Sequence, residues 1–406
     1  MISVEAAQGI IRDHLPAPRV ERIYFQAALH RVLAESLPAT MDLPPFDRAA
    51  VDGYALRSAD VPVVPVDLEL IGEIRAGGVP PAALRGGEAA AITTGAPVPA
   101  GADAILMMEH SRVSPDGRKV SILRPIGAGQ NIVPRSFEAA AGEAALPAGR
   151  LLGPAEIAVL ATFGYTEIAV FRRPRVALLA TGDELIEVQE VPEHNQIRNS
   201  NAYSLTAQLK SLGIEPDYLG IAADNPDDLR VKIAAGLDHD VMIVSGGASV
   251  GPYDLVKGAF GELGIRILFD RVAVRPGKPT IFGRKDDHLI FGLPGNPVSS
   301  FVSFENFVRP ALGRMCGLAH PELMRVAGEL EATMRQTPGR TAFLPAIACL
   351  GAGGWNIGPL PWKGSGDILG FSRANALVIF PADRCEMARG ERVEALLFSD
   401  FILRRS

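Results

Sequence analysis

The sequence contains only three cysteines, Cys316, Cys349 and Cys385, which are odd in number and far apart. This arrangement predicts reduced thiols in a cytoplasmic protein, not a disulfide framework. No Cys-x-x-Cys or His-x-x-x-His pair occurs, so we expect no zinc site. No apolar run approaches the ~20 residues of a membrane span, and residues 1–16 lack the basic and apolar regions of a secretory signal peptide.

A basic excess is also missing, because 40 Lys and Arg stand against 46 Asp and Glu, for a formal net charge of −6. A nucleic-acid partner is therefore not expected, since such partners are bound by a basic stripe. The absence of a Walker A or G-x-G-x-x-G match disfavours a P-loop ATPase and a Rossmann dehydrogenase. With 48% apolar residues in 406, the chain can form about two to four domains with sizeable cores.

One glycine-rich stretch carries the strongest chemical signal. The run from Val241 to Val244 predicts a buried strand, and Ser245-Gly246-Gly247 follows it directly. Asp254 then precedes a predicted helix at 255–263. A strand, a glycine turn and a helix N-terminus present backbone N–H groups to an anion. With a carboxylate beside it, the stretch suggests a phosphate neutralised by Mg²⁺, although a tight loop of an α/β sheet has the same pattern.

The chain around this stretch alternates strands and helices. Predicted strands at 175–180, 218–221 and 241–244 are separated by predicted helices at 200–213 and 226–237. This order is typical of a parallel sheet covered by helices on both faces. Acidic residues follow the strands at Asp183, Glu184, Asp224 and Asp254. Because ligands bind at the carboxyl ends of such strands, these acids favour a metal–phosphate site over solvated loop charges.

The remaining regions differ in their pattern of apolar residues. Helical spacing at 3–15, 25–35 and 151–164 predicts an N-terminal helical unit, interrupted by short apolar runs at 61–142 that predict a β insertion. Short apolar runs at 325–404 predict a small barrel or sandwich. The loop at 42–55 contains three aspartates and an arginine, and Thr94 lies in a Thr-Gly turn. Each fits either a ligand site or an ordinary connection.

Two further loops have suitable chemistry for anions. Proline and glycine fix the loop at 271–280, where Arg275 and Lys278 supply cations that suit a phosphate or another oxyanion. Residues 292–297 follow a predicted strand at 288–291 and precede a predicted helix at 297–313. This turn is a second close approach of the backbone at a helix N-terminus.

Six motifs, in this order, resemble those of the molybdopterin molybdenumtransferase family, which includes MoeA and the E domain of gephyrin. They span nearly the whole chain, and their combination is specific although each alone is not. The motifs are PPFDRAAVDGYA (44–55), TTGAPVP (93–99), TGDE (181–184), SGGASVG with a later Asp (245–254), RPGKP (275–279) and GLPGNP (292–297).

The resemblance implies a multidomain α/β-plus-β fold and a homodimer whose active sites are shared between subunits. Its four parts would be an N-terminal helical unit (1–42 and 143–172), an inserted β domain (43–142), a central parallel α/β molybdopterin-binding-like domain (173–322) and a C-terminal β-barrel-like domain (323–406).

The resemblance also implies a reaction: molybdenum from molybdate is inserted into adenylylated molybdopterin, AMP is released, and Mg²⁺ is the metal. The implied catalytic residues are Asp52, Thr94, Glu184 and Asp224. The implied substrate-binding residues are Thr181, Gly182, Asp183, Ser245, Gly246, Gly247, Ser249, Gly295, Asn296 and Pro297. The implied molybdate-binding residues are Arg275, Lys278, Pro279, Arg340 and Ser365. The implied metal ligands are Asp254, Asp224 and Glu184.

Some positions depart from the family pattern. Asn199 stands where Asp is frequent, so it is not among the expected metal ligands, and Arg275 replaces a frequent Lys but keeps the charge. Two other functions remain open. One is a nucleotidyltransferase that adenylylates molybdopterin, which needs only the central α/β unit. The other is a non-enzymatic scaffold, which the intact acids at the strand ends disfavour.

Overall fold

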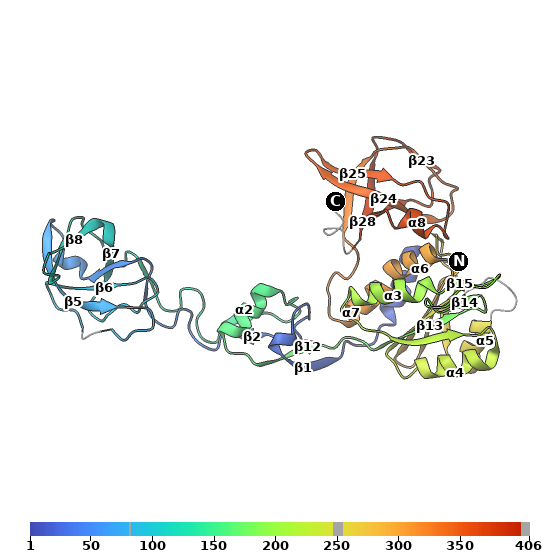
Figure 1. The fold of residues 1–406 in the computed structure, drawn as a ribbon, viewed down its shortest axis with the longest axis horizontal. Coiled ribbons are helices and arrows are strands. Elements are labelled where there is room, and N and C mark those ends of the chain that lie inside the picture. The colour runs from blue at the N-terminus through green and yellow to red at the C-terminus, as the bar shows by residue number, and fades with distance from the viewer. Residues whose placement is uncertain (81–82, 247–254, 399–406) are drawn as a thin grey trace. The chain divides into compact units, whose positions relative to one another are not determined.

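The computed structural model describes residues 1–80, 83–246 and 255–398, and its contacts define two compact units (Figure 1). Unit 1 contains Met1–Ile23, His30–Ala34 and the chain from Ala169 onward. Unit 2 contains Tyr24–Leu29 and Glu35–Ile168. Among the described helices, none is long and apolar enough to cross a membrane.

Unit 1 is built on a six-stranded sheet with the order β16-β13-β17-β21-β20-β18. β16, β13, β17 and β21 are parallel to one another, and β20 pairs antiparallel with both β21 and β18. β13 and β17 are buried along their whole length, as the continuous apolar runs predicted. The strands are β13 Val176–Thr181, β16 Asp217–Ala222, β17 Val241–Ser245, β18 Arg266–Phe269, β20 Ile281–Lys285 and β21 His288–Leu293.

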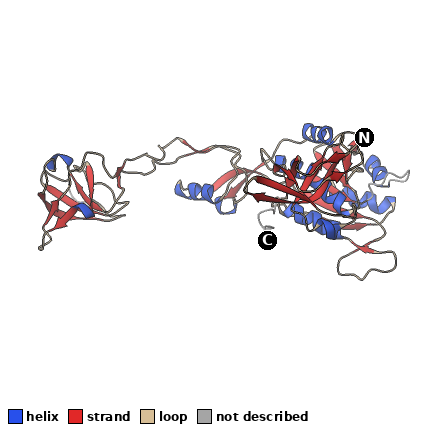
Figure 2. Ribbon diagram, turned by 90° about the horizontal axis from the view of Figure 1, so that it is seen from above, coloured by secondary structure: helices blue, strands red, loops and turns tan. Residues whose placement is uncertain are grey.

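Helices cover both faces of this sheet (Figure 2). Leu178 and Ile243 pack with helices α1, α3, α6 and α7 on one face, whereas Leu179 and Val244 pack with α4 and α5 on the other. Neighbouring residues of a strand point to opposite faces, so each strand contributes to both cores. The helices are α1 Val4–Asp13, α3 Ser200–Lys210, α4 Pro226–Gly236, α5 Leu255–Glu262, α6 Pro297–Ser303 and α7 Arg309–Met315.

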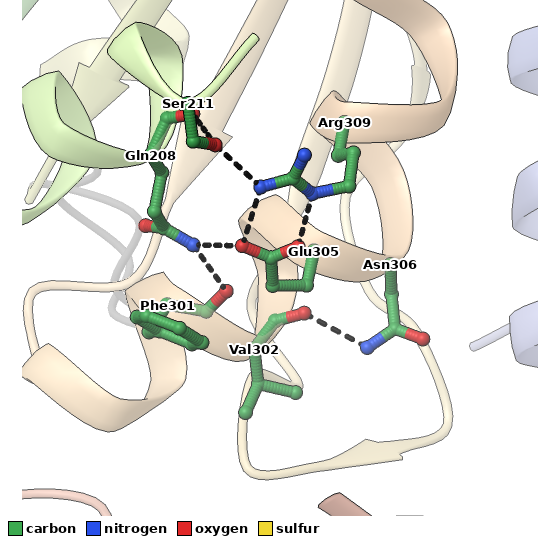
Figure 3. Close-up of polar contacts among 7 residues, drawn as sticks. All are labelled: Gln208, Ser211, Phe301, Val302, Glu305, Asn306 and Arg309. Carbon is green, nitrogen blue, oxygen red and sulfur yellow. Dashed lines mark hydrogen bonds and ion pairs between the residues drawn. The ribbon is translucent and has the colours of Figure 1, made fainter. Parts of the chain in front are cut away.

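Helices α6 and α7 are joined by a π-helical segment, Phe304–Val308, that holds a buried polar network (Figure 3). The Glu305 carboxylate accepts from Nε of Arg309 and, at 3.2 Å, from its Nη2. Gln208 of α3 donates to the same carboxylate at 2.7 Å, and Arg309 donates to Ser211 at 2.9 Å. The network therefore ties the C-terminal end of α3 to the α6–α7 helix.

The C-terminal part of unit 1 is a closed barrel, because β24 pairs with β25 at one edge and with β26 at the other. The strand order is β24-β25-β22-β28-β26, and β19 Val274–Arg275 adds to β24 as a parallel strand. Leu344, Val378 and Ala395 point into its core. The barrel strands are β22 Arg325–Leu330, β24 Thr341–Gly351, β25 Gly354–Pro359, β26 Ala376–Phe380 and β28 Arg392–Leu397.

Unit 2 contains the predicted β insertion, a six-stranded sheet with the order β7-β4-β6-β5-β9-β8. Its core includes Leu68, Ala89, Leu106 and Val120. Helix α2, Pro154–Thr162, lies within the predicted helical range 151–164. The strands of the sheet are β4 Gly53–Leu56, β5 Val66–Ile74, β6 Glu88–Ile92, β7 Ala104–Met107, β8 Ser111–Val113 and β9 Lys119–Ile122.

Short elements complete the described chain. The short strands are β1 Val20–Tyr24, β2 Leu37–Pro38, β3 Arg48–Ala49, β10 Ile132–Val133, β11 Ala144–Leu146, β12 Glu167–Phe171, β14 Leu185–Ile186, β15 Ile197–Arg198, β23 Met334–Arg335 and β27 Glu386–Met387. The short helices are the 3-10 turns Phe25–Ala27, Ser58–Asp60 and Met108–His110, and α8 Ile368–Phe371.

The helix predicted for 25–35 is wrong. Only Phe25–Ala27 forms a 3-10 turn there, and His30 has a φ of +60°, which a right-handed helix does not allow. Arg31 is nearly buried, and its Nη2 donates to Glu21 at 2.5 Å and to the Phe171 carbonyl at 2.9 Å. These tertiary contacts outweigh the helical propensity of the segment.

Helix α1 forms as predicted, with the Ser3 hydroxyl accepting from the amide of Ala6 at 3.1 Å. Its buried residues Val4, Ala7 and Ile11 join the core on one face of the central sheet. The resemblance instead placed residues 1–42 with 143–172, and that four-part division stays a prediction.

Candidate active site

Three parallel strands, β13, β17 and β21, end together at the carboxyl edge of the central sheet. The register pairs Ala180 with Ser245, and Ser245 with Leu293. Because parallel strands end at the same edge, the ends of β13, β17 and β21 are neighbours in space, and predicted substrate-binding residues lie at these ends: Thr181, Ser245, Gly246 and Gly295. The sequence prediction of a ligand-binding edge therefore has the geometry it requires.

A cavity of about 680 Å³ opens at this edge and is here called the larger cavity. Predicted substrate-binding residues contribute much of its lining, whereas Gly182, Asp183 and Asp224 do not line it. The predicted residues that line the larger cavity are Thr181, Glu184, Ser245, Gly246, Pro279, Gly295, Asn296 and Pro297.

The floor of the larger cavity offers a polar group without a protein partner. Thr181 is 2% exposed, and its hydroxyl has no hydrogen-bond partner among the described residues. A buried hydroxyl without a partner is destabilising, so a ligand atom that accepts or donates here would relieve that cost. Gly246 has a φ of +98°, and a Cβ there would lie 2.3 Å from the Thr181 carbonyl oxygen. Only glycine allows this close approach.

One carboxylate, Glu184, lines the larger cavity, and Asp183 and Asp224 lie on neighbouring segments. The backbone amide of Asp224 donates to Asp183 at 2.9 Å, which brings together the segments after β13 and β16. Burial raises the pKa of Asp224, and the negative charges of Asp183 and Glu184 raise it further. Within the described ranges, no three acidic, histidine or cysteine side chains converge closely enough to form a complete metal cage.

A second cavity of about 420 Å³, here called the smaller cavity, shares Pro279 and Asn296 with the larger one. All five residues predicted to bind molybdate line it: Arg275, Lys278, Pro279, Arg340 and Ser365. The three cationic side chains are half-buried, where they are less screened than on an open surface. Cations and a hydroxyl donor in one hollow suit a tetrahedral oxyanion.

Pairing between distant segments builds the smaller cavity. β19 runs parallel to β24 with Arg275 opposite Ala342, which brings Arg275 close to Arg340. The Ser365 carbonyl accepts from the amide of Val298 at 3.1 Å and so fixes its loop on the start of α6. Gly277 has a φ of +112°, and a Cβ there would lie 2.6 Å from the Ser303 hydroxyl. This glycine lets the cationic loop lie directly on α6.

Asp52 and Thr94 lie together in unit 2. Asp52 Oδ1 accepts from the Thr94 amide at 2.6 Å and from its hydroxyl at 2.9 Å. The hydrogen bond from the Thr94 backbone amide lowers the pKa of Asp52 most, and the hydrogen bond from the Thr94 hydroxyl lowers it further. This exposed carboxylate therefore stays ionised. The other two aspartates of the loop at 42–55 hold the loop itself: Asp42 binds Arg135, and Asp47 accepts from the Arg135 amide at 2.7 Å.

Three predicted residues, Gly247, Ser249 and Asp254, lie outside the described residues. The sequence reasoning in turn missed several residues of the larger cavity. One of them is Asn201, whose Nδ2 donates to Ser245 at 3.1 Å and to the Gly295 carbonyl at 2.8 Å. Asn199 caps α3 by accepting from the Ala202 amide. An Asn before a helix predicts such a cap but gives no sign of the cavity beside it.

Comparisons with known proteins agree with this geometry. Residues 2–164 match the MoeA N-terminal region (domain I and II), 177–314 a probable molybdopterin binding domain, and 327–398 the MoeA C-terminal region (domain IV). The molybdopterin molybdenumtransferase of Staphylococcus aureus (strain MRSA252) is 35% identical over 403 residues, covering 97% of this chain and 94% of the relative. This chain belongs to the molybdopterin molybdenumtransferase (MoeA) family.

Other MoeA relatives extend the likeness. The Staphylococcus epidermidis (strain ATCC 12228 / FDA PCI 1200) enzyme of the same name is 33% identical, over 97% of this chain and 94% of its own. A crystal structure of the molybdopterin biosynthesis MoeA protein from Pyrococcus horikosii has a TM-score of 0.84 and 32% identity, covering 98% of this chain and 99% of that one. The three matched regions together include the lining residues of both cavities and the Asp52–Thr94 pair.

Proposed function

We propose that this protein inserts molybdenum from molybdate into adenylylated molybdopterin and releases AMP. The observation that carries the proposal is the pair of adjoining cavities with different chemistry. The larger has the size and the polar floor for a phosphorylated pterin, and the smaller has the cations for an oxyanion. The two cavities share Pro279 and Asn296, so reactants bound in them would meet there.

The residues act mainly by position and charge. Arg275, Lys278 and Arg340 hold molybdate, and the turns at Gly246 and Gly295 present backbone to the pterin substrate. Holding two anions next to each other replaces a costly bimolecular encounter, and the fixed cations offset their repulsion. No enzyme nucleophile is required, because the reacting groups all come from the two substrates and water.

Mg²⁺ is the metal that fits the carboxylates beside the larger cavity. It prefers oxygen ligands and binds through one or two carboxylates, several waters and substrate phosphates, so a complete protein cage is not needed. The raised pKa of Asp224 reflects a concentration of negative charge that a divalent cation would relieve. Glu184 and Asp224, with Asp254 outside the described residues, are the proposed ligands. Bound Mg²⁺ would stabilise the leaving AMP.

We expect Asp224→Asn to raise the Mg²⁺ concentration needed for half-maximal AMP release by about tenfold, because one charged oxygen ligand is lost. In the unmodified protein, Mg²⁺ binding should weaken as the pH falls. Asp224 takes up its proton at a higher pH than an ordinary aspartate, and the proton competes with the metal. AMP release at varied Mg²⁺ concentration measures the first effect, and calorimetric Mg²⁺ titrations in the presence of AMP, at a series of pH values below neutrality, measure the second.

Asp227→Asn is the matched control, because its side chain is 92% exposed on the same segment. The control should keep the Mg²⁺ requirement and the pH dependence of the unmodified protein. An Asp224→Asn protein with an unchanged Mg²⁺ requirement would remove Asp224 from the metal site.

The proposal includes a homodimer in which unit 2 of one subunit completes the site on unit 1 of the other. Its support is the separation of the predicted residues: Asp52 and Thr94 belong to unit 2, whereas Glu184, Asp224 and the molybdate-binding residues belong to unit 1. We expect Asp52→Ala and Asp224→Ala homodimers each to be defective. A heterodimer of the two would have one site with both lesions and one intact site.

Co-expression with two different tags and tandem purification yields this heterodimer. It should recover up to about half of the unmodified activity, since one of two sites in a two-fold dimer is whole. A correctly assembled but inactive heterodimer would show that each site lies within one chain, and it would leave the enzymatic proposal standing.

One assay separates the proposal from its two alternatives. Purified protein is mixed with adenylylated molybdopterin, molybdate and Mg²⁺, and AMP is followed. Molybdate-dependent AMP release supports the proposal. Adenylylation of molybdopterin from ATP would identify the nucleotidyltransferase, and no turnover of either kind would identify a scaffold. The cytoplasm is the proposed location, because the described cysteines are all free thiols.

A further inference from the structure

The larger cavity contains a cation that no motif accounts for. Among the described residues that line it, Arg198 is the only Lys or Arg. We propose that Arg198 binds a phosphate group of the pterin substrate and thereby sets the affinity for that substrate. The inference rests on the proposed function, since it assigns a binding residue to the same cavity.

The local structure holds Arg198 at the cavity wall. It lies on β15, which pairs in parallel with β14 and places Arg198 opposite Ile186. The amide of Ile197 donates to the Glu184 carbonyl at 2.8 Å, and the amide of Asn199 donates to the Ile186 carbonyl at 2.9 Å. Arg198 is therefore fixed, through its own backbone neighbours, to the segment that carries the proposed metal ligand Glu184.

The guanidinium is partly restrained and partly available. Nε donates to the Glu190 carbonyl at 3.1 Å, which limits the rotation of the group. No hydrogen bond or ion pair to its two Nη groups occurs within the described parts of the chain. A guanidinium held by Nε presents the Nη atoms to a planar or tetrahedral oxyanion at low entropic cost.

Charge favours a phosphate over other ligands here. Glu184 lines the larger cavity, with Asp183 and Asp224 on neighbouring segments, so an incoming phosphate is repelled unless bound Mg²⁺ or a cationic side chain offsets these charges. Arg198 is the described cation in position to do so. Molybdate has its own cations in the smaller cavity, namely Arg275, Lys278 and Arg340. Arg198 should therefore affect the pterin substrate and leave molybdate unaffected.

The test compares Arg198→Gln, Arg198→Lys and the control Arg112→Gln, an exposed arginine on β8 of unit 2. We expect Arg198→Gln to raise the KM for adenylylated molybdopterin about tenfold to a hundredfold, because one charged hydrogen bond to the substrate is lost. The kcat and the molybdate half-saturation should change less than about twofold. Arg198→Lys keeps the charge but loses the two-nitrogen geometry, so its KM should lie between those of the unmodified protein and Arg198→Gln. Circular dichroism verifies the fold.

A second readout does not depend on turnover. Calorimetric binding of inorganic pyrophosphate should weaken by a similar factor in Arg198→Gln, and its salt dependence should become shallower. Unchanged pyrophosphate affinity together with an unchanged pterin KM would overturn the inference. A rise in molybdate half-saturation alone would also overturn it, by assigning Arg198 to the oxyanion. If the unmodified protein releases no AMP, the proposed function fails, while pyrophosphate binding still decides the role of Arg198.

Discussion

Arg309→Ala should lower the free energy of unfolding of unit 1 by about 3–5 kcal/mol, the cost of breaking a buried ion pair. Arg309 and Glu305 are 5% and 3% exposed in their side chains, so removing the guanidinium leaves a buried carboxylate without its counter-ion. Gln208 still donates to Glu305, but a neutral amide replaces little of the lost charge interaction.

The matched control is Arg314→Ala, which lies on the same helix as Arg309 and breaks the ion pair between Arg314 and Glu322. That pair is much more exposed, at 34% and 46%, and should contribute less than about 1 kcal/mol. Urea unfolding followed by tryptophan fluorescence reports on unit 1, because both tryptophans, Trp355 and Trp362, lie in it. Equal losses in the two variants would contradict the role of the buried pair.

The same network affects the site through helix ends. Asn199 caps α3, Asn201 lies in its first turn, and Asn296 directly precedes α6; all three line the larger cavity. Gln208 and Glu305 join these helices away from the cavity. A loosened network should therefore also reduce affinity for the pterin substrate.

Arg340→Ala should strongly weaken the use of molybdate in the reaction. Arg340 lines the smaller cavity with Arg275, Lys278 and Ser365, and its removal takes one of three cations from the proposed oxyanion site. We expect the molybdate concentration for half-maximal AMP release to rise about tenfold to a hundredfold. The affinity for adenylylated molybdopterin should change little, because Arg340 does not line the larger cavity.

Arg325→Ala provides the control, since Arg325 is an exposed arginine of the same barrel whose partner is Glu394. Titrating molybdate at saturating pterin substrate, and pterin substrate at saturating molybdate, separates the two affinities. If Arg340→Ala weakens only the pterin substrate, the assignment of the smaller cavity to molybdate is wrong.

Local patterns predicted the central fold well. The continuous apolar runs predicted as strands at 175–180 and 241–244 belong to strands buried on both faces. Ser3 before the helical spacing marks the start of α1, and Pro226 lies in the first turn of α4. Both signals act within a few residues and depend little on the rest of the chain. The helix predicted at 25–35 failed because Arg31 is held by residues far away in sequence.

The candidate site was predictable only where chemistry follows a strand. Acids after β13 and β16 lie together because parallel strands end at one edge. The meeting of Arg275 with Arg340 depends instead on β19–β24 pairing between segments far apart in the sequence, which only the family resemblance could anticipate. Similarly, nothing in the residue types separates Asp52 from Asp42 and Asp47, which hold their own loop.

The most direct test of the account counts products in a single reaction. Purified protein, adenylylated molybdopterin, Mg²⁺ and molybdate are incubated, and AMP and pterin-bound molybdenum are both quantified over time. The account predicts that one AMP appears for each molybdenum bound to pterin, and that omitting molybdate greatly slows AMP release. AMP release at the same rate without molybdate, with no molybdenum on the pterin, would contradict it.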